Sequence, residues 1–326
     1  MYWATGVETA SGTLGVTSIG RQQSGGYANE AFHDVPNDRW VVFSWLGAGL
    51  HGGVDCANDV GITMPGCWWG AQSLPRLVSL QPDGRSVKFP VVPEMEKLLV
   101  GSGTRCDQTL RMAGKDEGGL ALDDAGLVGP QSRVRVSASI VGRENDWSGA
   151  FGVDLLPRRK DGGGPCATAD WDAGLCLVTR VSVSRQLGSG QTYGGGGGGG
   201  GEQHHGFVNT SGRFSGNAPS PVTLLKLQAI HAHGGQEPGV SLEIPHTFNN
   251  YTFDIWIDRS VVEVYGDGGA QVLVMKTGIT AEPEPRAPYV WATGSVNATH
   301  EVTLRVIVHP VKSAVFTSDP GPWNPS

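Results

Sequence analysis

The segment 251–278 restricts the fold of this chain more than any other part of the sequence. Between residues 253 and 258, and again between 271 and 274, side chains alternate with the period of two that half-buried strands show. Two turns interrupt the pattern, at 258–260 and at the glycine-rich segment 266–269, where glycine accepts the positive backbone angles of tight turns. The pattern predicts three consecutive antiparallel strands, a β-meander.

Composition supports an all-β protein. The 326 residues include 50 glycines and 20 prolines, and only 17% of them are charged, which favours turn-rich β-structure over helices. This length can hold one large domain or two ordinary ones. The net charge of −7 argues against nucleic-acid binding, because phosphate recognition needs a basic face.

Several other runs read as strands. Residues 40–46 form a continuous apolar run, which predicts a strand in a sheet covered on both faces. Residues 134–140 and 175–183 have the alternation of sandwich strands. We expect the later strands at 223–230, 240–244 and 301–308, so that two antiparallel sheets pack face to face.

The amino-acid sequence of the meander resembles that of the signature strand pair in the C-terminal β-sandwich of glycoside hydrolase family 32. This family contains invertases, inulinases and levanases. A second match begins at Trp68 and continues through 83–84 and 89–98; it resembles the last propeller blade of that family and its exit into a linker helix. The meander match reads Ile257-Asp258-Arg259-Ser260-Val261-Val262-Glu263-Val264-Tyr265-Gly266-Asp267-Gly268-Gly269, and the other starts Trp68-Trp69-Gly70-Ala71-Gln72-Ser73-Leu74-Pro75-Arg76.

The resemblance implies an all-β fold in which a partial five-bladed β-propeller remnant precedes a two-sheet antiparallel β-sandwich. It divides the chain into an incomplete propeller with the end of blade 4 and blade 5 (1–93), a linker with a short helix (94–108), a sandwich (109–318) with a glycine-rich insertion at about 184–222, and a tail (319–326). An open propeller of this size would leave sheet edges and apolar faces uncovered.

The resemblance also suggests where a sugar would bind. In the family the corresponding blade turns an aromatic and small polar residues toward a central pocket, which makes Tyr27, Asn29 and Trp45 the candidate substrate-binding residues. An aromatic plane suits the apolar C–H face of a sugar ring. The alternative is that Trp45 is an ordinary core residue, and Glu30 stands where the family commonly has a lysine. Sucrose or a fructan is the expected substrate, with no cofactor.

None of the catalytic motifs of the family occurs in this sequence. The family places its nucleophile in Asn-Asp-Pro-Asn, a stabilising aspartate in Arg-Asp-Pro and its acid/base in Glu-Cys. Here the Asn-Asp pairs are followed by Val60, Arg39 and Trp147, and the only Asp-Pro is Asp319-Pro320. We therefore assign no catalytic residue and expect the missing N-terminal part of the propeller as a partner.

Two other classes of function stay open. The chain could be a non-catalytic, lectin-like carbohydrate-binding sandwich, or an oligomerisation module that forms a homo-oligomer. The most tempting carboxylate pair, Asp258 and Glu263, could reach the separation that glycosidases use. We interpret both carboxyls as structural, because a turn can bond Asp258 and a neighbouring strand can pair with Glu263.

Three further features have simple interpretations. The eight glycines 194–201 predict a surface loop, since no Lys-Ser/Thr follows as a phosphate-binding loop requires. His204-His205 and His231-Ala232-His233 lack a convincing third ligand, so we expect no metal site. The five cysteines allow two local disulfides, Cys56–Cys67 and Cys166–Cys176, or five reduced thiols.

The last group of features concerns cellular location. N-glycosylation acceptors occur at Asn209, Asn250 and Asn297, which are meaningful only in a secreted or vacuolar protein, the location we expect for the complete protein. The first residues lack the features of a signal peptide. No run approaches the roughly 20 apolar residues of a membrane helix, so we expect no membrane partner.

Overall fold

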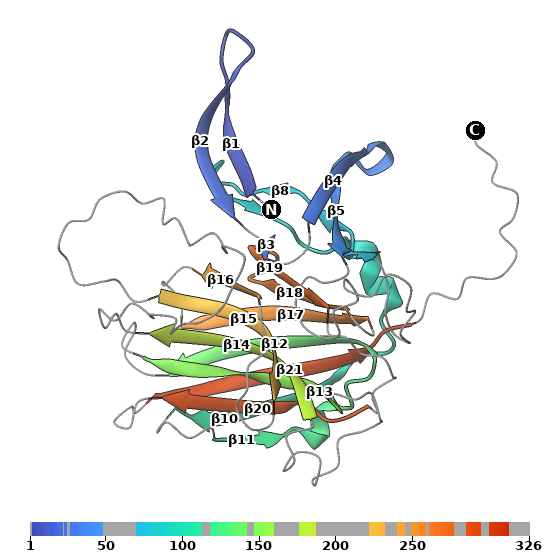
Figure 1. Cartoon of the computed structure of the whole chain (residues 1–326), viewed down its shortest axis with the longest axis vertical. Coiled ribbons are helices and arrows are strands. Elements are labelled where there is room, and N and C mark those ends of the chain that lie inside the picture. Colours follow the sequence, from blue (N-terminus) through green and yellow to red (C-terminus); the bar gives the residue numbers. More distant parts are fainter. Residues whose placement is uncertain are drawn as a thin grey trace, which may run out of the picture.

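The computed structural model describes residues 2–21, 23–24, 27–47, 70–112, 118–141, 147–159, 176–186, 222–231, 240–244, 249–258, 261–276, 285–294 and 300–312. Nearly all regular structure among them is β-strand, which confirms the predicted all-β class (Figure 1). The helices of these residues are the short 3-10 turns η1 (Val35–Asn37), η2 (Pro93–Leu98) and η3 (Asp123–Ala125). None of them is long and apolar enough to cross a membrane.

Two large sheets build the sandwich in the lower part of Figure 1. The first sheet has the strand order β10 (Thr104–Arg111), β21 (Glu301–Pro310), β12 (Gln131–Val141), β17 (Asn250–Asp258), β18 (Val261–Gly266), β19 (Gln271–Lys276) and β3 (Gln23–Ser24). The second has the order β11 (Gly118–Ala121), β20 (Tyr289–Gly294), β13 (Gly149–Arg159), β14 (Cys176–Gln186), β15 (Val222–His231) and β16 (Val240–Ile244).

The meander predicted from the sequence is confirmed. Strands β17, β18 and β19 pair in sequence order and antiparallel, in continuous register from Asp258↔Val261 to Gly266↔Gln271. Alternate residues of β17 face the space between the two sheets, where Phe253 and Ile255 are buried. The period of two therefore places one face of each strand in the core.

A single apolar core fills the space between the sheets. It takes alternate side chains from strands of both sheets, and most of these are excluded from water. Core residues include Val136, Phe151, Val153, Val181, Leu225, Leu227, Ile255, Val264, Leu304 and Val306. Two antiparallel sheets packed over such a core form the sandwich that the sequence predicts.

Smaller sheets from the N-terminal part lie on the far side of the meander. The hairpin β1 (Tyr2–Glu8) and β2 (Leu14–Arg21) and the sheet of β4 (Tyr27–Asp34), β5 (Arg39–Gly47), β6 (Gly70–Gln72) and β7 (Arg76–Leu77) project from the sandwich in Figure 1. Strands β8 (Ser79–Leu80) and β9 (Val87–Lys88) form a short ribbon.

The burial of β5 differs from the prediction. A strand covered on both faces was expected at 40–46, but Trp40 is 53% exposed and Trp45 39% exposed. Val42 and Leu46 are buried in a second apolar cluster, which also contains Val87 and, from the sandwich, Trp256. The face of β5 with Val42 and Leu46 thus packs toward the sandwich, Trp45 is exposed on the opposite face, and Trp40 is exposed at the start of the strand.

The 3-10 helix η2 forms ion pairs with both the N-terminal sheets and the sandwich. Pro93 occupies its start, which suits the fixed backbone angle of proline, and the 3-10 turn ends at Leu98. Glu94 pairs with Arg39 of β5 at 2.6 Å, and Glu96 pairs with Arg133 of β12 at 2.5 Å. The two carboxylates of one helical turn therefore contact both parts of the chain.

The turn between β18 and β19 makes a second contact. Gly269 has a φ of +93°, and its carbonyl accepts a hydrogen bond of 2.8 Å from the Phe89 amide. A Cβ at Gly269 would lie 2.5 Å from the Phe89 carbonyl carbon. Glycine is required here both for the left-handed backbone and for the close approach of two backbones.

Several predictions fall outside the described residues. They concern the glycine run 194–201, the tail 319–326, His204, His205 and His233, the acceptors Asn209 and Asn297, and Cys56, Cys67 and Cys166. Among the described cysteines, Cys106 is free and half-buried.

Candidate functional site

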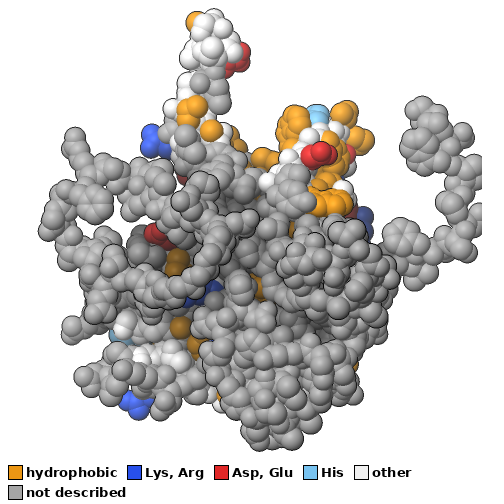
Figure 2. Space-filling view, in the orientation of Figure 1, with side chains coloured by type: hydrophobic (Ala, Val, Ile, Leu, Met, Phe, Trp, Pro, Cys, Tyr) orange, Lys and Arg blue, Asp and Glu red, His pale blue; other side chains and the backbone are white. Residues whose placement is uncertain are grey.

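A cavity of about 530 Å³ lies on the exposed side of the β4–β5–β6 sheet. Figure 2 shows hydrophobic side chains gathered over this part of the molecule. The cavity is lined by Glu30, Ala31, Phe32, Phe43, Ser44, Trp45 and Gln72. Its walls therefore combine aromatic rings with one carboxylate and one amide, a composition typical of small-molecule sites.

The aromatic wall is built by strand alternation. Phe43 and Trp45 share a face of β5, and Phe32 of the neighbouring strand stacks on Phe43 with ring centroids 6.1 Å apart. Trp45 pairs in register with Tyr27 on one side and with Gln72 on the other. Because Trp45 is exposed and lines the cavity, the alternative that it is a core residue is wrong.

Asn29 points to a different partner. The pairing of β4 and β5 has one extra residue on β4 between Tyr27 and Glu30, a bulge that re-aims the intervening side chains. The Ser44 hydroxyl donates a hydrogen bond to the Asn29 Oδ1 atom. Asn29 is exposed and is not among the described residues that line the cavity, but its partner Ser44 is one of them. Trp45 and Tyr27 face each other in register on β5 and β4.

Beneath the cavity, a buried polar network fixes the strand that carries Trp45. The Ser44 amide donates to the Ser73 hydroxyl at 2.9 Å, and the Ser73 amide donates back to the Ser44 carbonyl at 2.9 Å. The Arg76 guanidinium donates to both hydroxyls, at 3.1 Å for Ser73. All three side chains are buried, so this network orients β5 from its inner face.

The network continues into the sandwich through Glu263 of β18. Its carboxylate accepts a hydrogen bond of 2.6 Å from the Leu74 amide and one of 2.7 Å from the Tyr265 hydroxyl. Burial raises the pKa of Glu263, and the positive charge of Arg76 opposes this rise. A carboxylate surrounded by donors in this way is a structural anchor between two parts of the chain.

The structural interpretation of the Asp258 and Glu263 pair agrees with these contacts. Asp258 is exposed and accepts a hydrogen bond of 3.1 Å from the Gln131 side chain. Glu263 is buried on the face of the meander that packs against the N-terminal sheets, where it accepts the hydrogen bond of the Leu74 amide. One carboxyl faces water and the other faces a donor network, so the two do not flank a common cavity.

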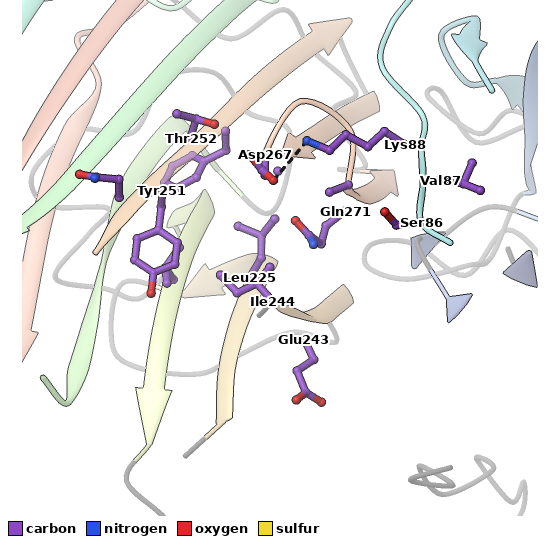
Figure 3. A pocket seen from close by; sticks show the side chains of 15 residues that line it. Ser86, Val87, Lys88, Leu225, Glu243, Ile244, Tyr251, Thr252, Asp267 and Gln271 are labelled. Atoms are coloured by element: carbon purple, nitrogen blue, oxygen red, sulfur yellow. Dashed lines mark hydrogen bonds and ion pairs between the residues drawn. The ribbon is translucent and has the colours of Figure 1, made fainter. Parts of the chain in front are cut away.

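A second cavity, of about 580 Å³, opens where the N-terminal sheets meet the sandwich (Figure 3). Its wall takes Val183, Leu225, Ile244 and Tyr251 from the two sandwich sheets, and Lys88 from β9. An ion pair of 3.3 Å between Lys88 and Asp267, dashed in Figure 3, crosses from one part of the chain to the other. No sequence pattern indicated this cavity, because its lining residues come from segments far apart in the chain.

One of the three predicted glycosylation acceptors lies among the described residues. Asn250, the second glycosylation acceptor, is exposed at the start of β17, and Thr252 of the same triplet is exposed too. Both residues line the second cavity. The described residues contain no cluster of three metal-ligating side chains.

Comparison with known proteins identifies the fold. No protein-family model matches the chain, and no curated protein sequence matches it. Among solved structures, fructan 1-exohydrolase IIa from Cichorium intybus is similar with a TM-score of 0.55 and 16% identity, covering 94% of this chain and 52% of that one. A variant of that enzyme in complex with 1-kestose gives a TM-score of 0.54 at 16% identity and covers 90% of this chain and 50% of that one.

A bacterial enzyme shows the same likeness. Sucrose-6-phosphate hydrolase from Lactobacillus gasseri gives a TM-score of 0.50 at 11% identity, covering 91% of this chain and 44% of that one. This chain thus spans about half the length of the solved structures it matches. The predicted resemblance to fructan and sucrose hydrolases is confirmed as a shared fold that covers part of those enzymes.

Proposed function

We propose that this chain is the C-terminal part of a glycoside hydrolase family 32 enzyme, and that the complete protein hydrolyses sucrose or a fructan. The observation that carries the proposal is the unequal coverage of the fold match. The likeness extends over 94% of this chain but only 52% of the fructan exohydrolase. The sequence motifs at 68–76 and 257–269, in the order of the family, support the same assignment.

In the complete protein the reaction would follow the retaining double displacement of the family. A carboxylate attacks the fructosyl carbon to form a covalent intermediate while a protonated carboxyl assists the leaving group, and water then releases fructose. The motifs that carry both groups do not occur in this sequence. We therefore infer that residues 1–326 have little or no hydrolytic activity alone.

Within this proposal, the cavity beside Trp45 forms the edge of the sugar site. The exposed indole offers a stacking plane, and the Glu30 carboxylate and Gln72 amide offer hydrogen bonds to sugar hydroxyls. The buried Ser44–Ser73–Arg76 network holds this wall in place. Tyr27 and Asn29 remain proposed neighbours of that edge.

The exposed face of β4 and β5 favours association as a second role. Phe32 and Trp45 are exposed on the same face as Phe43, and this apolar face has no covering layer around Trp45 in the described part of the chain. An uncovered apolar face beside a sheet edge is a docking surface. We propose the missing propeller blades as its partner, in a secreted or vacuolar protein that carries a glycan at Asn250.

The test is a hydrolysis and binding assay on purified residues 1–326. We expect no fructose release from sucrose or inulin, and the detection of release would contradict the proposed location of catalysis. If the chain binds inulin in calorimetry, Trp45→Ala should weaken binding by roughly 2- to 12-fold, since one aromatic contact contributes about 0.5–1.5 kcal/mol. Trp40→Ala is the matched control, because Trp40 is exposed on the same strand but does not line the cavity.

A further inference from the structure

His309 is a buried histidine at the place where the sandwich meets the segment that follows η2. It belongs to β21, is only 7% exposed and pairs in register with Arg133 of β12. A Cβ at Gly103 would overlap the Cε1, Nδ1 and Nε2 atoms of the His309 ring. The imidazole therefore lies directly against the glycine backbone, with no room between them for water.

Two backbone hydrogen bonds join the chain beside His309 to the end of η2. The Val100 amide donates to the Pro310 carbonyl at 2.9 Å, and the Lys312 amide donates to the Leu98 carbonyl at 2.8 Å. We call these contacts between 98–103 and 309–312 the η2 junction. Because His309 is part of it, a change in the charge of the imidazole acts directly on the junction.

The charged side chains around His309 balance one another without it. Arg133 pairs with Glu96 and with Asp254, each at 2.5 Å, and Arg135 pairs with Glu96 at 2.8 Å. These two guanidinium and two carboxylate groups, from β12, η2 and β17, are the charges that act on the imidazole. Each carboxylate is already paired with an arginine, so a proton on His309 would add a positive charge that this group does not neutralise.

The ring nitrogens also favour the neutral form. The buried Nδ1 atom of His309 has no hydrogen-bond partner among the described residues. A neutral imidazole can keep its proton on Nε2 and leave Nδ1 bare, whereas a charged imidazole carries N–H on both nitrogens, so protonation would bury a donor without an acceptor. Burial, together with the positive charges of Arg135 and Arg133, lowers the pKa of His309 from its ordinary value of 6.5.

We propose that His309 is a pH-sensitive switch that weakens the η2 junction when it takes up a proton. In an opened junction the ring meets water and binds a proton near pH 6.5, as an ordinary histidine does, while the closed junction binds it only at lower pH. The closed form is therefore most stable above pH 6.5, and its advantage falls as the pH drops from 6.5 toward the lower pKa of the buried ring. The switch does not depend on the proposed hydrolase activity.

Hydrogen exchange of purified residues 1–326, followed by NMR at pH 7.5, 6.5 and 5.5, measures the opening of the junction. Protection factors, which correct for the intrinsic pH dependence of exchange, are compared for the Val100 and Lys312 amides. Because one proton is linked to opening, we expect the protection of both to fall by up to about tenfold between pH 6.5 and 5.5, with little change above 6.5. The Val181 amide in the second sheet should stay more strongly protected, since it exchanges only when the sandwich itself unfolds.

Two variants remove the titrating group in different ways. His309→Phe keeps a planar ring against Gly103, and His309→Asn keeps a neutral polar side chain. In both, the protection of the junction amides should be the same at pH 6.5 and 5.5. His33→Asn is the matched control, because His33 is exposed on β4 and lies outside the junction, so its loss should leave the wild-type response unchanged.

Three results would overturn the proposal. The first is equal protection of the Val100 and Lys312 amides at pH 6.5 and 5.5 in the wild-type chain. The second is a fall in His309→Phe or His309→Asn as large as that of the wild type. The third is protection of these amides at pH 5.5 as strong as that of the Val181 amide, because the junction would then open only together with the whole sandwich.

Discussion

The carboxylate of Glu263 should be among the most sensitive positions of the chain, although it lies outside both cavities. Replacing it by alanine removes the acceptor of the Leu74 amide and of the Tyr265 hydroxyl, and the negative charge near Arg76. Breaking a buried charge network by removing one partner costs about 3–5 kcal/mol. Glu263→Gln keeps one acceptor oxygen and loses only the charge, so we expect it to cost about 2 kcal/mol.

Urea denaturation followed by circular dichroism measures both free energies of unfolding. Asp258→Asn is the control, because this exposed carboxyl of the same meander should change the free energy of unfolding by less than about 1 kcal/mol. Hydrogen exchange adds a local measurement, in which the Leu74 amide should lose protection in Glu263→Ala. If Glu263→Ala unfolds within about 1 kcal/mol of the wild-type chain and the Leu74 amide stays protected, the anchor role is refuted.

Three further changes test other parts of the structure. Gly269→Ala should lower the free energy of unfolding by about 2–4 kcal/mol, because alanine disfavours the left-handed backbone and its Cβ would clash with the backbone of Phe89. Gly268→Ala should lower it by only about 1–2 kcal/mol, because a Cβ there meets no atom and only the left-handed backbone is disfavoured. Urea denaturation measures both values. A hydrogen bond from Arg105 is the main reason that the pKa of Asp107 falls from 3.8 to about 2. The stability this carboxylate adds is present above pH 3.8 and is lost as the pH falls toward 2, so an acid titration of Asp107→Asn should show a smaller loss over that range. If the protein is secreted and carries a glycan at Asn250 as proposed, Asn250→Gln should migrate faster than the wild type on a gel. This difference should disappear when N-glycans are removed enzymatically from both proteins.

Local patterns were sufficient to predict the sandwich. Strands β17, β18 and β19 follow from the period of two and from glycine at the turns, since each strand turns one face into the core between the sheets. The burial of their other face in the second apolar cluster could not be read from this pattern. The start of η2 follows from Pro93, which suits the first position of a helical turn. Signals of this kind depend on neighbours within a few residues.

The exposed face of β5 and the buried charges could not be predicted in the same way. An apolar run does not reveal which of its faces will be covered, so Trp45 read equally well as core residue and as cavity wall. The partner of Glu263 lies 189 residues earlier in the chain, at Leu74. The burial of the Arg185 side chain could not be predicted either, because it depends on the position of β14 within the sandwich. Contacts between distant segments decide each of these cases.

The mass of the protein in its native source tests the central claim most directly. An antibody against the sandwich would detect it on an immunoblot after enzymatic removal of N-glycans. We expect a band well above the 34.3 kDa of this chain, close to twice that mass, because the chain spans about half of the enzymes whose fold it shares. A single band at 34.3 kDa would contradict the claim that these residues are part of a longer hydrolase.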